Sequence, residues 1–97
     1  MVNLAILVRL EAKPGKEQVV ADFIKGALPL AMAEAGTINW FALQMGPSTF
    51  GIFDTFETSQ ARAAHLNGEI AKALMANAQD LLAVDPAIEM VDLLAVK

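Results

Sequence analysis

Residues 37–65, TINWFALQMGPSTFGIFDTFETSQARAAH, decide the fold of this chain. Aromatic and β-branched side chains fill 37–45 and 49–57, and the Gly-Pro-Ser link between these two runs predicts an antiparallel hairpin. A helix is expected to begin at Thr58-Ser59, and it carries the only histidine, His65. The sole Trp, the sole His and several Phe residues therefore lie on adjoining elements. We expect them to surround an apolar space that suits an aromatic ligand.

Regular patterns continue on the N-terminal side of this stretch. In 2–11 every second side chain is apolar, which predicts a half-buried strand with one uniformly apolar face. Residues 16–35 place apolar side chains at helical spacing. Pro29 lacks the amide hydrogen that an uninterrupted helix needs, so a kink or break is expected near it. Gly36 is the expected C-terminal cap of this helix.

The C-terminal side completes the order of elements. After a break at Asn67-Gly68, residues 69–82 predict a further helix and 87–96 a last strand. The order β-α-β-β-α-β is typical of the α+β ferredoxin-like fold, an antiparallel sheet with two helical regions on one face. No repeat or linker interrupts the chain, so 1–97 is expected to form a single domain.

The composition predicts a partner for this domain. Of its 97 residues 56% are hydrophobic, and the mean hydropathy is +0.47. A domain of this size has little interior in which to bury so many apolar side chains. The helices cover only one face of the predicted sheet, and the other face is also rich in apolar residues. We therefore expect a homodimer through the sheet face, in which two sheets pack together as a dimeric α+β barrel.

Several classes of protein do not fit the sequence. The longest apolar stretch, 27–33, is much shorter than the roughly 18–20 residues of a membrane span, and the first residues do not resemble a signal peptide. We expect a cytoplasmic protein without a membrane partner. The net charge is -4 and the basic residues are scattered, which argues against binding to nucleic acid. The absence of Cys and a lone His argue against a metal site.

Three groups of residues resemble the antibiotic-biosynthesis monooxygenase family of dimeric α+β barrels. They are the Lys13-Pro14-Gly15-Lys16-Glu17 sequence after the first strand, the Ala35-Gly36-Thr37 step, and 53–59 (FDTFETS) ahead of Ala64-His65-Leu66. In that family the strand before the second helix reads acidic-x-aromatic, which Asp54 and Phe56 match. The similarity extends over nearly the whole chain.

The resemblance implies a homodimer with one pocket per subunit between the sheet and the helices. It also implies oxygenation of small phenols or quinols without metal, flavin or any other cofactor, because the deprotonated substrate itself reacts with dioxygen. A haem-degrading branch of the same fold is not matched, since Val8, His65 and Met75 stand where that branch has Asn, Trp and its ligand His. The chain also has no Tyr, so no tyrosine-based mechanism applies.

His65 and Asp54 are the candidate catalytic residues. An imidazole titrates near neutral pH, so His65 is a candidate for the group that removes a phenolic proton. Only a short connection separates the strand that carries Asp54 from the helix that carries His65, so Asp54 would orient the imidazole ring. The same two residues are equally suited to a structural pair that fixes the helix against the sheet.

Trp40, Phe53, Phe56 and Arg62 are the candidate substrate-binding residues. Trp40 would stack on an aromatic ligand and donate its indole N–H to a ligand oxygen. Strand alternation directs Asn39 to the opposite face, so we rank it below Trp40. Phe53 and Phe56 would line the pocket, and Arg62, one helical turn before His65, would steady an anion. Each of these four also fits a simpler role in the core, the interface or the solvated surface.

Three functions remain open from the sequence. The leading hypothesis is a cofactor-independent monooxygenase that acts on a small aromatic compound. The alternatives are a non-catalytic dimer that binds and sequesters an apolar metabolite, and an isomerase or decarboxylase of the same fold. The fold alone does not separate these functions.

Overall fold

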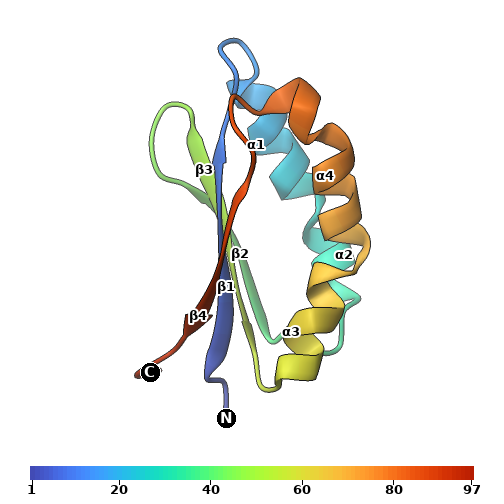
Figure 1. Ribbon diagram of the computed structural model, residues 1–97, viewed down its shortest axis with the longest axis vertical. Coiled ribbons are helices and arrows are strands. Elements are labelled where there is room, and N and C mark those ends of the chain that lie inside the picture. Colours follow the sequence, from blue (N-terminus) through green and yellow to red (C-terminus); the bar gives the residue numbers. More distant parts are fainter.

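The computed structural model describes residues 1–97, and it consists of one sheet with every helix packed on the same side (Figure 1). Thr58 caps the helix that begins at Ser59 through its side chain, and Pro29 lies in the first turn of the helix that begins at Leu28. The elements in chain order are β1 (Leu4–Glu11), α1 (Glu17–Gly26), α2 (Leu28–Met32), β2 (Asn39–Gln44), β3 (Thr49–Phe56), α3 (Ser59–Leu66), α4 (Glu69–Leu81) and β4 (Ala87–Asp92).

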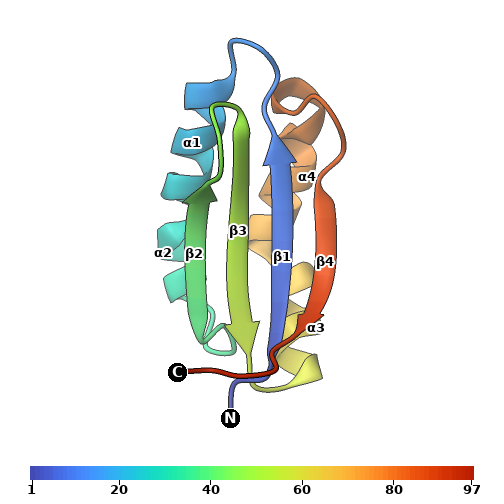
Figure 2. The same ribbon diagram turned by 90° about the vertical axis from the view of Figure 1, so that its left-hand side faces the viewer.

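The sheet has the strand order β2-β3-β1-β4, and every neighbouring pair is antiparallel. Figure 2 shows these strands from the side that carries no helix. The order confirms the ferredoxin-like α+β fold that the sequence predicts. Two register pairs matter for the site: Asp54 of β3 lies opposite Trp40 of β2 on one side and opposite Ile6 of β1 on the other.

The helix-facing side of the sheet forms the core. Of the alternating apolar residues in 2–11, Ile6, Val8 and Leu10 are buried here and Leu4 is partly buried. Each such side chain contributes about 1.5–3 kcal/mol when it leaves water completely. The main cluster comprises Ile6, Val8, Leu10, Ala12, Val20, Ile24, Phe50, Ile52, Phe56, Leu74 and Leu82.

The helical region expected over 16–35 divides into α1 and α2. The break falls at Ala27, and Pro29 stands near the beginning of α2, where its missing amide hydrogen costs nothing. The predicted role of Gly36 is wrong, because α2 already ends at Met32 with Ala33 as its C-terminal cap. Gly36 instead lies where the chain passes α3: a Cβ atom there would come within 2.8 Å of the Cβ of Ala61.

The outer strands are shorter than the sequence predicts. The last register pair between β1 and β4 joins Leu4 to Asp92, and one further hydrogen bond runs from the amide of Leu93 to the carbonyl of Asn3. Beyond that point neither strand has a partner, so the alternation of 87–96 continues without sheet pairing. None of the helices is long and apolar enough to cross a membrane.

The face of the sheet that carries no helix (Figure 2) has apolar side chains at its centre. Phe41 and Phe53 stack across β2 and β3 with ring centroids 6.4 Å apart, and Phe53 lies opposite Leu7 of β1. Phe41 remains 49% exposed. An aromatic pair of this kind contributes about 0.5–1.5 kcal/mol beyond its area, and nothing within the chain covers it.

Candidate active site

Two neighbouring elements bring His65 to Asp54. Thr58 caps α3 by accepting a hydrogen bond from the amide of Ala61 at 3.0 Å, which fixes the helix immediately after β3. His65 lies in the last turn of α3 and faces the sheet, and Asp54 points toward it from the helix-facing side of β3. The imidazole Nε2 is 2.8 Å from Oδ2 of Asp54. The contact is an ion pair when the imidazole is protonated.

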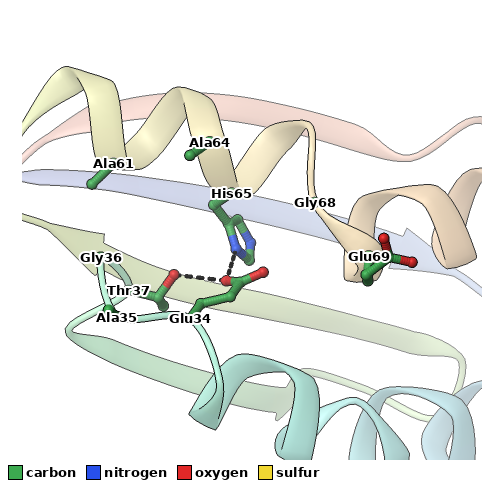
Figure 3. A pocket seen from close by; sticks show the side chains of 9 residues that line it. All are labelled: Glu34, Ala35, Gly36, Thr37, Ala61, Ala64, His65, Gly68 and Glu69. Carbon is green, nitrogen blue, oxygen red and sulfur yellow. Dashed lines mark hydrogen bonds and ion pairs between the residues drawn. The ribbon is translucent and has the colours of Figure 1, made fainter.

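A second carboxylate lies on the other side of the imidazole. Nδ1 of His65 is 2.5 Å from Oε1 of Glu34, which belongs to the loop between α2 and β2 (Figure 3). Asp54 is 1% exposed, His65 9% and Glu34 23%. These three side chains therefore form an array that runs from the sheet interior toward the surface, and we call it the Glu34–His65–Asp54 array.

Thr37 holds Glu34 in place. Its hydroxyl donates a hydrogen bond of 2.8 Å to Oε1 of Glu34, the same oxygen that contacts His65 (Figure 3). The amide of Thr37 also donates to the carbonyl of Glu34 at 3.2 Å, which closes the turn. Sequence reasoning missed Glu34, although a carboxylate beside the Ala35-Gly36-Thr37 step was a visible signal. Its partner is 31 residues away, and no local pattern reports such a contact.

The array keeps His65 protonated at neutral pH. Burial alone would lower the pKa of His65, but the interactions with Asp54 and Glu34 outweigh it and raise the pKa from 6.5 to about 9. One imidazolium between two carboxylates leaves the array with a net charge of one negative unit. The imidazole has no free nitrogen in this state.

Two cavities meet at the loop that carries Glu34. The first has a volume of about 330 Å³ and lies between this loop and the helices α3 and α4 (Figure 3). The second has a volume of about 390 Å³ and lies between the loop, α2 and the start of β2. His65 lines the first cavity and Trp40 the second, while Glu34, Ala35 and Thr37 line both.

Small residues keep the first cavity open. Its helical wall consists of Ala61, Ala64 and Gly68, which leave room beside the imidazole. A Cβ atom at Gly68 would lie 3.0 Å from Oε2 of Glu34, so a larger residue would press against the carboxylate. The absence of a side chain at Gly68 therefore keeps Oε2 of Glu34 uncovered.

Trp40 is the main aromatic residue near the array. It points to the helix-facing side of β2, opposite Asp54 in the register, and packs against Ala27, Ala31 and Ile70. Its indole Nε1 is buried and has no hydrogen-bond partner in the chain. Asn39 faces the other way, as the alternation predicts, and its Oδ1 accepts a hydrogen bond from Thr55.

The other expected binding residues lie apart from the cavities. Phe53 is on the opposite face of the sheet, stacked on Phe41. Phe56 is fully buried and touches His65 from the core side, with ring centroids 5.4 Å apart. Arg62 donates to the carbonyls of Ala5 and Val91 at 3.3 and 3.4 Å, so it ties α3 to β1 and β4.

The donor set does not form a metal centre. The two carboxylates of the array lie on opposite sides of the imidazole and do not converge on one point. No group of three His, Asp or Glu side chains is arranged to hold an ion.

The fold and the array define a ferredoxin-like α+β protein with a buried carboxylate–imidazole–carboxylate site. No family model matches the chain, and no curated protein matches it either. A solved structure does: NE2512, a protein of unknown function from Nitrosomonas europaea, is 63% identical over 100% of this chain and 94% of its own, with a TM-score of 0.98. The chain belongs to the same family as NE2512.

More distant structures share the fold. A protein from Nitrosomonas europaea that is proposed to be an antibiotic biosynthesis monooxygenase has a TM-score of 0.83 at 17% identity, with 95% of this chain and 90% of that one covered. A protein of unknown function from Bacteroides thetaiotaomicron, described as a possible oxidoreductase, has a TM-score of 0.79 at 15% identity, with 94% and 97% covered. The resemblance to the monooxygenase family is thereby supported at the level of the fold.

Proposed function

We propose that the protein binds a small hydroxylated aromatic compound beside the Glu34–His65–Asp54 array and oxygenates it without a metal or flavin. The observation that carries this proposal is the array itself: a buried imidazole held by two carboxylates, one of which lines two cavities. Buried titratable clusters next to cavities are typical of sites that move protons. The shared fold with monooxygenase-like proteins adds to this argument.

The cavity beside Trp40 suits the ring of such a ligand. Most of its wall is apolar, and it includes Leu28, Met32 and Ile38. The buried indole N–H has no partner in the chain, so a ligand oxygen that reached it would break no existing bond. A planar ring with one or two oxygen substituents uses both features.

The chemistry requires little from the protein. A phenol that loses its proton becomes electron-rich and reacts with dioxygen; one oxygen atom becomes a ring carbonyl, and the other leaves as water with two hydrogens of the substrate. In this proposal the protein positions the ring, removes the hydroxyl proton and limits the access of water. In that transfer His65, held by Asp54, would fix the position and the charge of the array, because both of its nitrogens already contact carboxylates.

A second candidate function is a binding module without catalysis. The observation that favours it is the full occupation of the imidazole: both nitrogens contact carboxylates, and the ring is protonated at neutral pH. A histidine in this state is a structural cation and does not act alone as a base. The same cavities would then sequester an apolar metabolite.

We also propose that the protein acts as a homodimer through the open face of the sheet. The stacked Phe41 and Phe53, together with Leu7, would form the centre of that interface. Pairing through this face would give a dimeric α+β barrel and would leave the helices, the array and both cavities on the outside.

Oxygen uptake separates the two functions. Purified protein is incubated with a panel of hydroquinones and naphthols, and dioxygen consumption is compared between the wild type and His65→Gln. Turnover that falls by about 100-fold or more in the variant supports catalysis at the array. Absence of turnover with every compound, combined with saturable quenching of Trp40 fluorescence, would replace the oxygenase by the binding module.

A further inference from the structure

Glu34 is the only member of the array that can reach a ligand. Asp54 is almost completely buried, and both imidazole nitrogens of His65 are occupied. Oε1 of Glu34 already accepts from Thr37 and contacts His65, whereas Oε2 takes part in no hydrogen bond and lies on the side of the carboxylate away from Thr37 (Figure 3). This second oxygen is therefore the point at which the array meets the cavities.

The charge of the array limits what can bind there. It carries two carboxylates and one imidazolium, and the exposed Glu69 on the rim of the first cavity is already paired with Lys72 at 3.6 Å. A ligand that arrives as an anion would add another negative charge to a partly buried site that has no free cation, which is costly. A neutral ligand with a hydroxyl donor meets no such penalty.

We propose that Oε2 of Glu34 accepts the hydroxyl proton of a ligand that enters as a neutral phenol. The ligand O–H bond breaks, its electron pair stays on the ligand oxygen, and a new O–H bond forms at Glu34. The imidazolium of His65 keeps its proton throughout. The array and the ligand together carry one negative charge both before and after the transfer. The step therefore moves a negative charge from Glu34 to the ligand and does not bury an additional one. This inference rests on the proposed function.

The surroundings of Glu34 favour the anion once it has formed. After the transfer Glu34 is neutral, and the imidazolium of His65, which lines the first cavity, remains beside the new anion. Oε2 of Glu34 lies on the side of Gly68, which also lines this cavity, so the hydroxyl group of a ring bound there can reach the carboxylate. Aromatic carboxylates, which have no proton to give at neutral pH, should be excluded.

The test uses 4-nitrophenol, whose absorbance band reports how strongly its hydroxyl group is hydrogen-bonded. Below the dye's own pKa, the wild type should bind the neutral form and shift its band to longer wavelength, because a hydrogen bond to the carboxylate draws the hydroxyl proton away from the ring, and calorimetry should show no binding of 4-nitrobenzoate. Glu34→Gln should remove the shift and weaken binding by about tenfold or more, the effect of losing a hydrogen bond to a charged group. Glu69→Gln removes a carboxylate from the rim of the first cavity and should retain the signal.

A conservative variant guards against loss of folding. Glu34→Asp keeps a negative charge beside His65 and should recover part of the band shift that Glu34→Gln loses, with near-ultraviolet circular dichroism as the check on structure. Equal binding and an equal band shift in the wild type and a folded Glu34→Gln would overturn the assignment, as would tight binding of 4-nitrobenzoate. A folded Glu34→Asp that shifts the band no more than Glu34→Gln would also overturn it.

Different experimental outcomes would rule out this inference and the proposed function. A band shift of the dye that depends on Glu34, without oxygen uptake from any hydroquinone, would remove the oxygenase and leave the proton acceptor. Oxygen uptake that persists in Glu34→Gln would remove the acceptor and leave the oxygenase. Absence of binding by every phenol would remove both.

Discussion

Nδ1 of His65 lies 2.5 Å from Oε1 of Glu34, and this contact ties the loop between α2 and β2 to the last turn of α3. On its opposite side the same ring meets Asp54 of β3. One imidazolium thus joins a helix, a loop and a strand, and its charge state affects both the stability of the fold and the chemistry of the cavities.

The first prediction concerns the pH dependence of stability. The pKa of His65 is about 9 in the folded chain and 6.5 when unfolded, so its stabilisation is complete below pH 6.5 and is lost as the pH rises through 9. The shift corresponds to about 3 kcal/mol. Urea unfolding at several pH values between these limits should show this decline in the wild type and a flatter profile in His65→Gln. Identical slopes in both proteins would contradict the ion-pair assignment.

The second prediction concerns the coupling of Asp54 to His65. Asp54→Asn leaves the imidazolium with one carboxylate and should reduce the free energy of unfolding by about 3 kcal/mol, as expected when a buried pair loses one partner. The double variant with His65→Gln should lose less than the sum of the single changes, by about 1 kcal/mol or more. Asp22→Asn on the exposed face of α1 is the control and should stay within about 0.5 kcal/mol of the wild type.

The third prediction compares two glycines. At Gly36 a Cβ atom would lie 2.8 Å from the Cβ of Ala61, so Gly36→Ala should displace the loop that carries Glu34 and lower stability by about 1–3 kcal/mol. At Gly26, at the end of α1, nothing lies within 4 Å of the added atom. Gly26→Ala should therefore be neutral or stabilise the chain by up to about 1 kcal/mol. Thermal unfolding measures both, and equal effects would refute the close approach.

The fold and the site differ in how far the sequence predicts them. The alternation of 2–11 predicted the core face of β1, because period-two patterns report burial directly, and the Gly-Pro-Ser link predicted the β2–β3 hairpin. The meeting of Asp54 with His65 followed from the short connection between β3 and α3. Glu34 did not follow from any pattern, because its position depends on how the α2–β2 loop packs against a helix 31 residues later. Strand ends were also overestimated, since pairing stops where the neighbouring strand stops.

The fourth prediction concerns assembly. Phe41 is 49% exposed on the open face of the sheet and stacks on Phe53. Phe41→Glu should place a charge at the centre of the proposed interface and shift the protein from dimer to monomer, as measured by light scattering after size-exclusion chromatography. Val19→Glu changes an exposed residue on α1, in the helical layer, and should leave the dimer intact. A wild type that is monomeric at micromolar concentration would exclude the proposed pairing.

The last prediction concerns the indole N–H of Trp40. Trp40→Phe keeps an aromatic ring against Ala27 and Ala31 but removes the buried donor that has no partner in the chain. If that donor binds a ligand oxygen, its loss should weaken the binding of oxygen-substituted rings by about 0.5–1.5 kcal/mol, or roughly 2- to 10-fold. Binding of a ring without oxygen, such as naphthalene, should change much less. Calorimetry with naphthol and naphthalene on both proteins provides the comparison, and Asn39→Ala on the other face of β2 is the control. Equal loss for both ligands would assign Trp40 a packing role alone.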